Sequence, residues 1–172
     1  MALIRSLNGI TPTFGQGIFL AETAVVVGDV VMGDDCSVWY NAVVRGDVNG
    51  IRIGHRVNIQ DNATLHCTYR KCGLSIGNDV SIGHNAIVHG CTVEDKVLIG
   101  MGTIVMDQAV IGTGSVIAAG AVVTQGTVVE PGSLMVGVPA KRMGAVPQAL
   151  REGEIERIAR NYKLYAGWFK KE

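Results

Sequence analysis

Three histidines, His66, His84 and His89, are the side chains of this sequence best suited to chemistry. Neutral imidazoles bind zinc and comparable divalent ions, and three of them with one open position form a known type of catalytic zinc site that holds water. We therefore predict a metal site at these histidines, with zinc as the expected ion and iron or cobalt as alternatives. The simpler interpretation is that all three are polar surface residues. We expect no cofactor-binding residues beyond the metal ligands.

The elements that must position these histidines follow from a six-residue repeat. Such a period is typical neither of an α-helix nor of one long strand, and it indicates short strands that turn a corner and stack about 4.8 Å apart. Glycine is abundant, at 23 residues, and often holds the second position of the repeat, where we expect it to adopt backbone angles that other residues avoid. The aliphatic residues that open the repeats are Leu20, Val26, Met32, Val38, Val44, Ile53, Ile59, Leu65, Ile76, Ile82, Val88, Val93, Ile99, Val105, Ile111, Ile117, Val123, Val129 and Met135.

The repeat places two of the histidines in one column. Arg45, His66 and His89 each hold the second position of their repeats, and these repeats share one face on successive coils if the insertion at residues 71–75 bulges outward. Backbones one strand spacing apart would allow both imidazoles to reach the same ion.

The other two histidines are placed differently. His84 falls on another face, above Asp61, where it could not easily reach the ion of His66 and His89 within one chain. If three prisms pack around an axis, His84 of one subunit can approach the pair on its neighbour, so the arithmetic favours a metal site between subunits. His55 has no acidic or histidine partner evident, and we interpret it as a surface residue.

After Pro147 the apolar spacing becomes helical, which predicts one amphipathic helix packed along the prism. We expect a single domain, with the β-helix and a short lead-in at residues 1–143 and the helix at residues 144–172. The apolar positions with this spacing are Ile155, Ile158, Ala159, Tyr162, Ala166 and Phe169.

Taken together, these features resemble the γ-class carbonic anhydrases and their carbonic-anhydrase-like relatives. The resemblance covers nearly the whole chain, and it implies a mainly β fold, a left-handed parallel β-helix of hexapeptide repeats in a triangular prism with a C-terminal α-helix. It also implies a homotrimer. The matching segments besides the repeats and the helix are residues 44–47, 58–62, 83–84 and 89–91.

The resemblance assigns roles to the metal-site residues. It implies that His66, His84 and His89 are the ligands, with His84 contributed by the adjacent subunit. Arg45 and Asp47 resemble an ion pair between subunits that supports the trimer.

The resemblance also implies the reaction. A γ-type carbonic anhydrase, a lyase, would interconvert CO₂ and bicarbonate through metal-bound hydroxide at the trimer interfaces. Gln60 and Asp61 match the pair that orients the metal-bound water, and Tyr162 matches a residue of the C-terminal helix near the site. The chain departs from the archetype because Val48 replaces a proton-relay glutamate, and the loop 67–73 contains no acidic residue.

Three alternatives remain open at this point. Hexapeptide acyltransferases share the repeat, and they often end in a segment like Gly-Val-Pro-Ala-Lys at residues 137–141. A metal site could also serve an acyl-CoA thioesterase, or merely stabilise a trimer without catalysis. The three histidines argue against a CoA-dependent acyltransferase, because such an enzyme usually uses a single catalytic histidine.

The charge and the cysteines of the sequence indicate which binding partners and which cellular compartment to expect. The formal net charge is zero and no basic cluster is present, so we expect no nucleic acid partner, and no apolar run is long enough for a membrane helix. Without a signal-peptide pattern at the N-terminus, we expect a cytoplasmic protein with four free thiols, Cys36 being part of the core. A bridge between Cys67 and Cys72 is the alternative.

Overall fold

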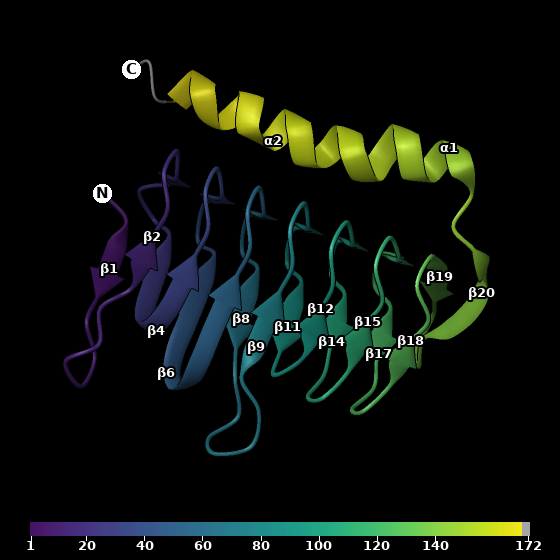
Figure 1. Cartoon of the computed structure of the whole chain (residues 1–172), viewed down its shortest axis with the longest axis horizontal. Helices are drawn as coiled ribbons and strands as arrows, with labels where there is room; N and C mark the ends of the chain where they lie inside the picture. The colour runs from purple at the N-terminus through teal and green to yellow at the C-terminus, as the bar shows by residue number, and fades with distance from the viewer. Residues whose placement is uncertain (170–172) are drawn as a thin grey trace.

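The chain folds into a left-handed parallel β-helix with the outline of a triangular prism, and one helix runs along its side (Figure 1). The computed structural model describes residues 1–169. The strands make about seven turns, and strands of successive turns pair in parallel. The predicted fold class is therefore confirmed.

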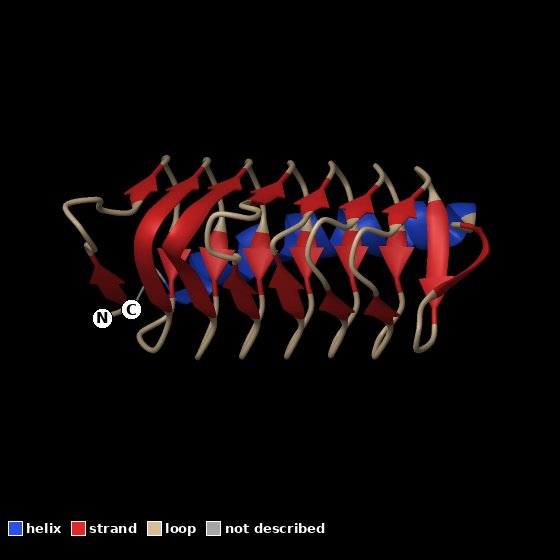
Figure 2. Cartoon of the chain, turned by 90° about the horizontal axis from the view of Figure 1, so that it is seen from below, coloured by secondary structure: helices blue, strands red, loops and turns tan. Residues whose placement is uncertain are grey.

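The strands lie on three faces of the prism, which Figure 2 shows as repeated rungs. The first face holds β1 (Leu3–Arg5), β8 (Thr64–His66), β11 (Ile87–His89), β14 (Ile104–Val105) and β17 (Val122–Val123). The second face holds β2 (Thr13–Phe14), β9 (Leu74–Ile76), β12 (Thr92–Val93), β15 (Val110–Ile111) and β18 (Val128–Val129). The long strands β4 (Val25–Met32) and β6 (Val43–Ile53) take part in both of these faces.

The third face carries the helix. Its parallel strands are β3 (Phe19–Leu20), β5 (Ser37–Val38), β7 (Asn58–Ile59), β10 (Ser81–Ile82), β13 (Leu98–Ile99), β16 (Val116–Ile117) and β19 (Ser133–Val136). The last strand, β20 (Lys141–Ala145), turns back antiparallel to β19, and the predicted boundary at residue 143 falls within it.

The core consists of stacked aliphatic layers, as the repeat predicts. Ile59, Ile82, Ile99 and Ile117 lie one above another on the third face, and their side chains are fully buried. Each such side chain contributes roughly 1.5–3 kcal/mol by leaving water. A fully occupied interior of small layers explains why so few aromatic residues are needed.

The glycines of the second repeat position serve a purpose different from the one predicted. The left-handed backbone falls at the fourth position, for example at Arg56 with φ 56° and Asn85 with φ 58°. A Cβ atom on Gly54 would instead lie 2.8 Å from the backbone of Gly77 in the next coil. The expectation of unusual angles at the second position is wrong for these glycines, which are required because adjacent coils approach closely.

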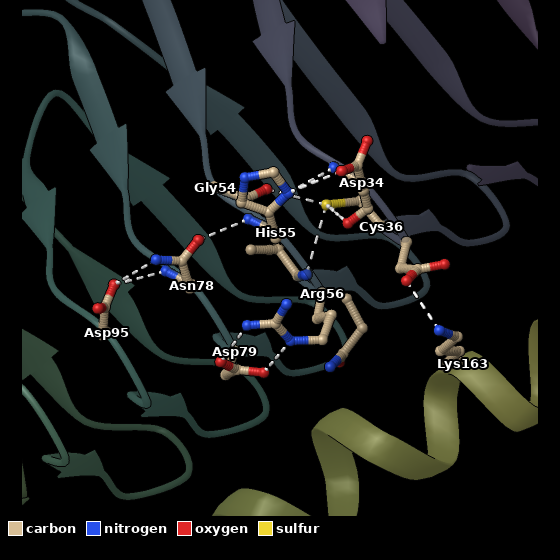
Figure 3. Close-up of polar contacts among 12 residues, drawn as sticks. Asp34, Cys36, Gly54, His55, Arg56, Asn78, Asp79, Asp95 and Lys163 are labelled. Carbon is tan, nitrogen blue, oxygen red and sulfur yellow. Dashed lines mark hydrogen bonds and ion pairs between the residues drawn. The ribbon is translucent and has the colours of Figure 1, made fainter. Parts of the chain in front are cut away.

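The corner between the second and third faces carries a hydrogen-bond ladder, shown in Figure 3. The backbone N–H of His55 donates to Asn78 Oδ1 at 2.9 Å, and the backbone N–H of Asn78 donates to Asp95 Oδ1 at 2.7 Å. His55 Nδ1 accepts the N–H of Asp34 at 2.9 Å and lies 3.3 Å from its carboxylate. The expectation that His55 has no acidic partner is therefore wrong. His55 takes part in the hydrogen-bond ladder at a half-exposed corner.

The C-terminal helix is continuous and lies on the third face. It comprises α1 (Gln148–Leu150), a π-helical stretch η1 (Arg151–Ile155) and α2 (Glu156–Phe169). Ile155 is buried against Val116 near one end, and Ala166 packs with Trp39 near the other. Helix packing along the prism is thus as predicted, and residues 170–172 of the predicted segment lie outside the described part of the chain.

The four cysteines are free thiols. Cys36 is buried in the core, as predicted. Burial raises the pKa of Cys67 to about 11 and that of Cys91 to about 12, so both thiols stay protonated at neutral pH. Over residues 1–169, none of the helices combines the length and apolarity that crossing a membrane would demand.

Removing a core layer should destabilise the prism strongly. We expect Ile99→Ala to lower the free energy of unfolding by about 2–5 kcal/mol, because the cavity cannot collapse between two fixed coils. Urea unfolding at fixed protein concentration measures the change. Val128→Ala, at a side chain 68% exposed, is the control, and equal losses in the two variants would contradict the layered core.

Candidate metal centre

His66 and His89 face each other across adjacent rungs of the first face. The pairing of β8 with β11 puts the two residues in register, although they are 23 positions apart in sequence. His66 Nδ1 lies 3.0 Å from His89 Nε2. The predicted column is therefore present.

Each of these imidazoles has a carboxylate on its other nitrogen. His66 Nε2 lies 2.8 Å from Asp47 Oδ1, and His89 Nδ1 lies 2.6 Å from Asp107 Oδ1. Because an ionised carboxylate only accepts hydrogen bonds, the protons belong on these outer nitrogens and the facing nitrogens present lone pairs. Metal-binding histidines in proteins usually have such outer partners.

The facing nitrogens suit one shared divalent ion. Two nitrogens 3.0 Å apart can both lie about 2.0–2.1 Å from a single zinc ion. Without an ion, the contact of 3.0 Å requires a proton on one of the facing nitrogens, because two lone pairs at this distance would repel each other. The donor set of His66 and His89 therefore fits the expected metal.

Asp47 connects the pair to an arginine. Its carboxylate contacts the guanidinium of Arg45 within the same chain as well as His66. Burial alone would raise the pKa of Asp47, but the hydrogen bonds from His66 and Arg45 outweigh it and hold the pKa below its usual range. Asp47 is thus ionised at neutral pH.

Asp107 is a site residue that the sequence analysis did not identify. Partial burial favours a raised pKa, yet hydrogen bonds from Thr68, His89 and Lys71 lower the pKa of Asp107 to about 2. The repeat does hold the signal, because Asp107 is in the third position of the repeat that begins at Val105, one coil beyond the repeat of His89.

His84 lies apart from the pair within one chain. As predicted, it is next to Asp61, with Nδ1 2.8 Å from Asp61 Oδ2, and its Nε2 is 3.5 Å from the hydroxyl of Tyr162. Within the described residues 1–169, no three histidine, cysteine, aspartate or glutamate side chains are arranged to hold a metal ion. The expected third ligand, His84, therefore does not join His66 and His89 within one chain.

The two remaining predicted residues, Gln60 and Tyr162, lie near His84. Gln60 is buried, and its amide nitrogen donates to Asn58 Oδ1 at 3.0 Å. Burial, followed by the charge of Asp61, raises the pKa of Tyr162 to about 12, so its hydroxyl stays protonated. A cavity of about 360 Å³ between α2 and the third face is lined by Gln60, His84 and Tyr162, together with apolar side chains and the polar side chains of Arg157 and Asn161.

Sequence comparisons identify relatives over most of the chain. Two family models match, one described as bacterial transferase hexapeptide (six repeats) at residues 90–125 and one as hexapeptide repeat of succinyl-transferase at residues 73–106. A Methanocaldococcus jannaschii protein named probable carbonic anhydrase is 55% identical over 87% of this chain and 91% of its own length. A Geobacillus kaustophilus protein named carbonic anhydrase is 44% identical over 98% and 91%.

A solved structure is similar over its full extent. A hexapeptide transferase family protein from Anaplasma phagocytophilum superposes with a TM-score of 0.91 at 36% identity, covering 97% of this chain and 98% of that one. The prism and its helix are therefore shared with this protein, whose name points to a transferase, whereas the two sequence relatives are named for another reaction.

We predict that loss of either facing imidazole weakens zinc binding. His66→Ala and His89→Ala should each raise the Kd for zinc by more than about 100-fold, since a lost ligand costs more than the 10–100-fold of an outer partner. Competition with a chromophoric chelator measures the Kd. His55→Ala is the matched control because His55 serves the corner ladder, and a similar loss there would refute the assignment.

Proposed function

Because the chain belongs to the γ-class carbonic anhydrase-like family of hexapeptide-repeat proteins, we propose that it catalyses the reversible hydration of CO₂ to bicarbonate. The observation that carries the proposal is the pair of His66 and His89, with facing nitrogens 3.0 Å apart and a carboxylate behind each ring. A cytoplasmic location is part of the same proposal.

The metal, in this proposal, is held by His66 and His89 of one subunit and by His84 of a neighbouring subunit. Zinc is the expected ion, with iron or cobalt as alternatives. When bound, a divalent ion lowers the pKa of water to about 7, which makes hydroxide accessible at neutral pH. Support for the shared site comes from the facing nitrogens of His66 and His89 and from the exposed position of His84, whose side chain is 39% exposed.

Gln60 and Asp61 orient the attacking water in this proposal. The amide of Gln60 is held by Asn58, and Asp61 accepts the backbone N–H of Tyr40 at 3.2 Å, so both groups are fixed before substrate arrives. A fixed acceptor aims the oxygen lone pair of water at carbon. Tyr162, which lies against His84, is protonated and acts as a hydrogen-bond donor.

Hydration also releases a proton that must reach solvent. Val48 is apolar and packs against the core, and residues 67–73 include no acid, so the usual relay groups are missing there. We propose that the proton passes directly to solvent or buffer. Turnover should therefore depend on buffer concentration.

The homotrimer belongs to the proposal too. Arg45 is 44% exposed and contacts Asp47, which in turn contacts His66. An ion pair at a subunit boundary would thus be connected directly to a metal ligand. Residues 1–143 and the helix after them would act as one domain in each subunit.

One observation favours a second candidate, transfer or hydrolysis of an acyl group from a CoA thioester. His84 has Asp61 on one nitrogen and lies beside a cavity of about 360 Å³ whose walls are partly apolar and include Arg157. An imidazole oriented by a carboxylate is a common general base. The same cavity would then hold the acyl chain. A trimer stabilised by metal without any catalysis is the third outcome.

Stopped-flow measurement of CO₂ hydration tests the main proposal. We expect zinc-loaded protein to be active and His89→Ala to fall to the uncatalysed rate, with His55→Ala retaining activity. Hydrolysis of acetyl-CoA by the same samples tests the second candidate. Zinc binding without CO₂ hydration would refute the carbonic anhydrase proposal, and thioester hydrolysis that survives His89→Ala but not His84→Ala would favour the second.

A further inference from the structure

Asp107 gathers several donors at the edge of the first face. Its carboxylate is 14% exposed and accepts from His89 Nδ1 at 2.6 Å and from the hydroxyl of Thr68 at 2.7 Å. Lys71 Nζ lies 3.4 Å from the same oxygen that Thr68 contacts. One side chain thus connects a histidine of β11 with the loop that follows β8.

The backbone around Gly90 leaves room for this carboxylate. Gly90 has φ 51°, and a Cβ atom there would lie 2.6 Å from Asp107 Oδ1 and 2.6 Å from Cys72 Sγ. Any larger residue would push the carboxylate away from His89. Because Gly90 has no Cβ atom, the carboxylate of Asp107 has the space to reach Nδ1 of His89.

We propose that Asp107 is a positioning residue, which selects the Nδ1–H form of His89 and turns Nε2 toward His66. The proposal rests on the metal site of the proposed function. An imidazole can rotate about its Cβ–Cγ bond, and the hydrogen bond at one nitrogen decides which nitrogen keeps a lone pair. With Asp107 on Nδ1, the lone pair of Nε2 is directed into the gap between the rings.

The two carboxylates behind the histidines are not equivalent. Asp47 divides its hydrogen bonds between His66 and Arg45, which lies on the same column. Thr68 and Lys71 contact the carboxylate oxygen of Asp107 that does not face His89. These donors therefore fix the direction of the other oxygen, which accepts from His89. Asp107 therefore has the more rigid contact with its histidine.

Metal affinity and the histidine tautomer together test this role. We expect Asp107→Ala to raise the Kd for zinc by about 10–100-fold, the usual cost of losing such a partner, and Asp107→Asn to raise it less because the amide oxygen still accepts. In metal-free protein, two-bond ¹H–¹⁵N spectra should show the Nδ1–H form of His89 in the parent chain and a shift toward the Nε2–H form in Asp107→Ala. The absence of one signal in His89→Ala assigns the resonance.

Thr68→Ala separates positioning of His89 from anchoring of the loop. It removes one of the two donors that hold the carboxylate but leaves the carboxylate on His89, so the Nδ1–H form should persist and the zinc Kd should rise less than in Asp107→Ala. An unchanged tautomer in Asp107→Ala, or an unchanged Kd, would overturn the proposal. These readouts need no CO₂, so zinc binding without hydration would count against the proposed function while the role of Asp107 is decided by its own measurements.

Discussion

The stacking of parallel coils about 4.8 Å apart is the constraint on which the rest of this structure depends. It holds the aliphatic layers together, and it also brings His66 beside His89 and Asp107 one coil beyond them. None of these residues is close to another in sequence. The site is therefore a product of register, because a slip of one residue would turn both imidazoles into the core.

Within the stacked coils, polar side chains form hydrogen bonds with one another. Over the described residues, every buried side-chain nitrogen and oxygen has a hydrogen-bond partner, so the prism contains no unpaired group that would destabilise it. On the first face, Asp47 and Asp107 each accept a hydrogen bond from one nitrogen of an imidazole. The other nitrogen of each imidazole faces the gap between His66 and His89. That arrangement is costly unless a cation occupies the gap, and either a shared proton or the proposed metal ion can take this place.

The periodicity of the sequence was sufficient to predict the layers, the column of His66 and His89, and the helix on the prism, since each follows from counting positions. It was insufficient at the corners, where direction matters more than period. Asp107 reaches His89 only because Gly90 leaves space, and His55 meets Asp34 through the geometry of a left-handed turn. The close approach of neighbouring coils, which explains Gly54, is likewise invisible in one sequence.

The loop between β8 and β9 protrudes from the prism as a bulge at the side of the first face (Figure 1). Each coil touches only its neighbours above and below, so residues added to such a bulge do not propagate along the stack. Evolution can therefore lengthen or shorten this loop while the rungs stay in place, provided that Thr68 and Lys71 keep their contacts with Asp107. The bulge is thus a place where relatives can differ in length without disturbing the pairing of β8 with β11, as long as these two contacts are kept.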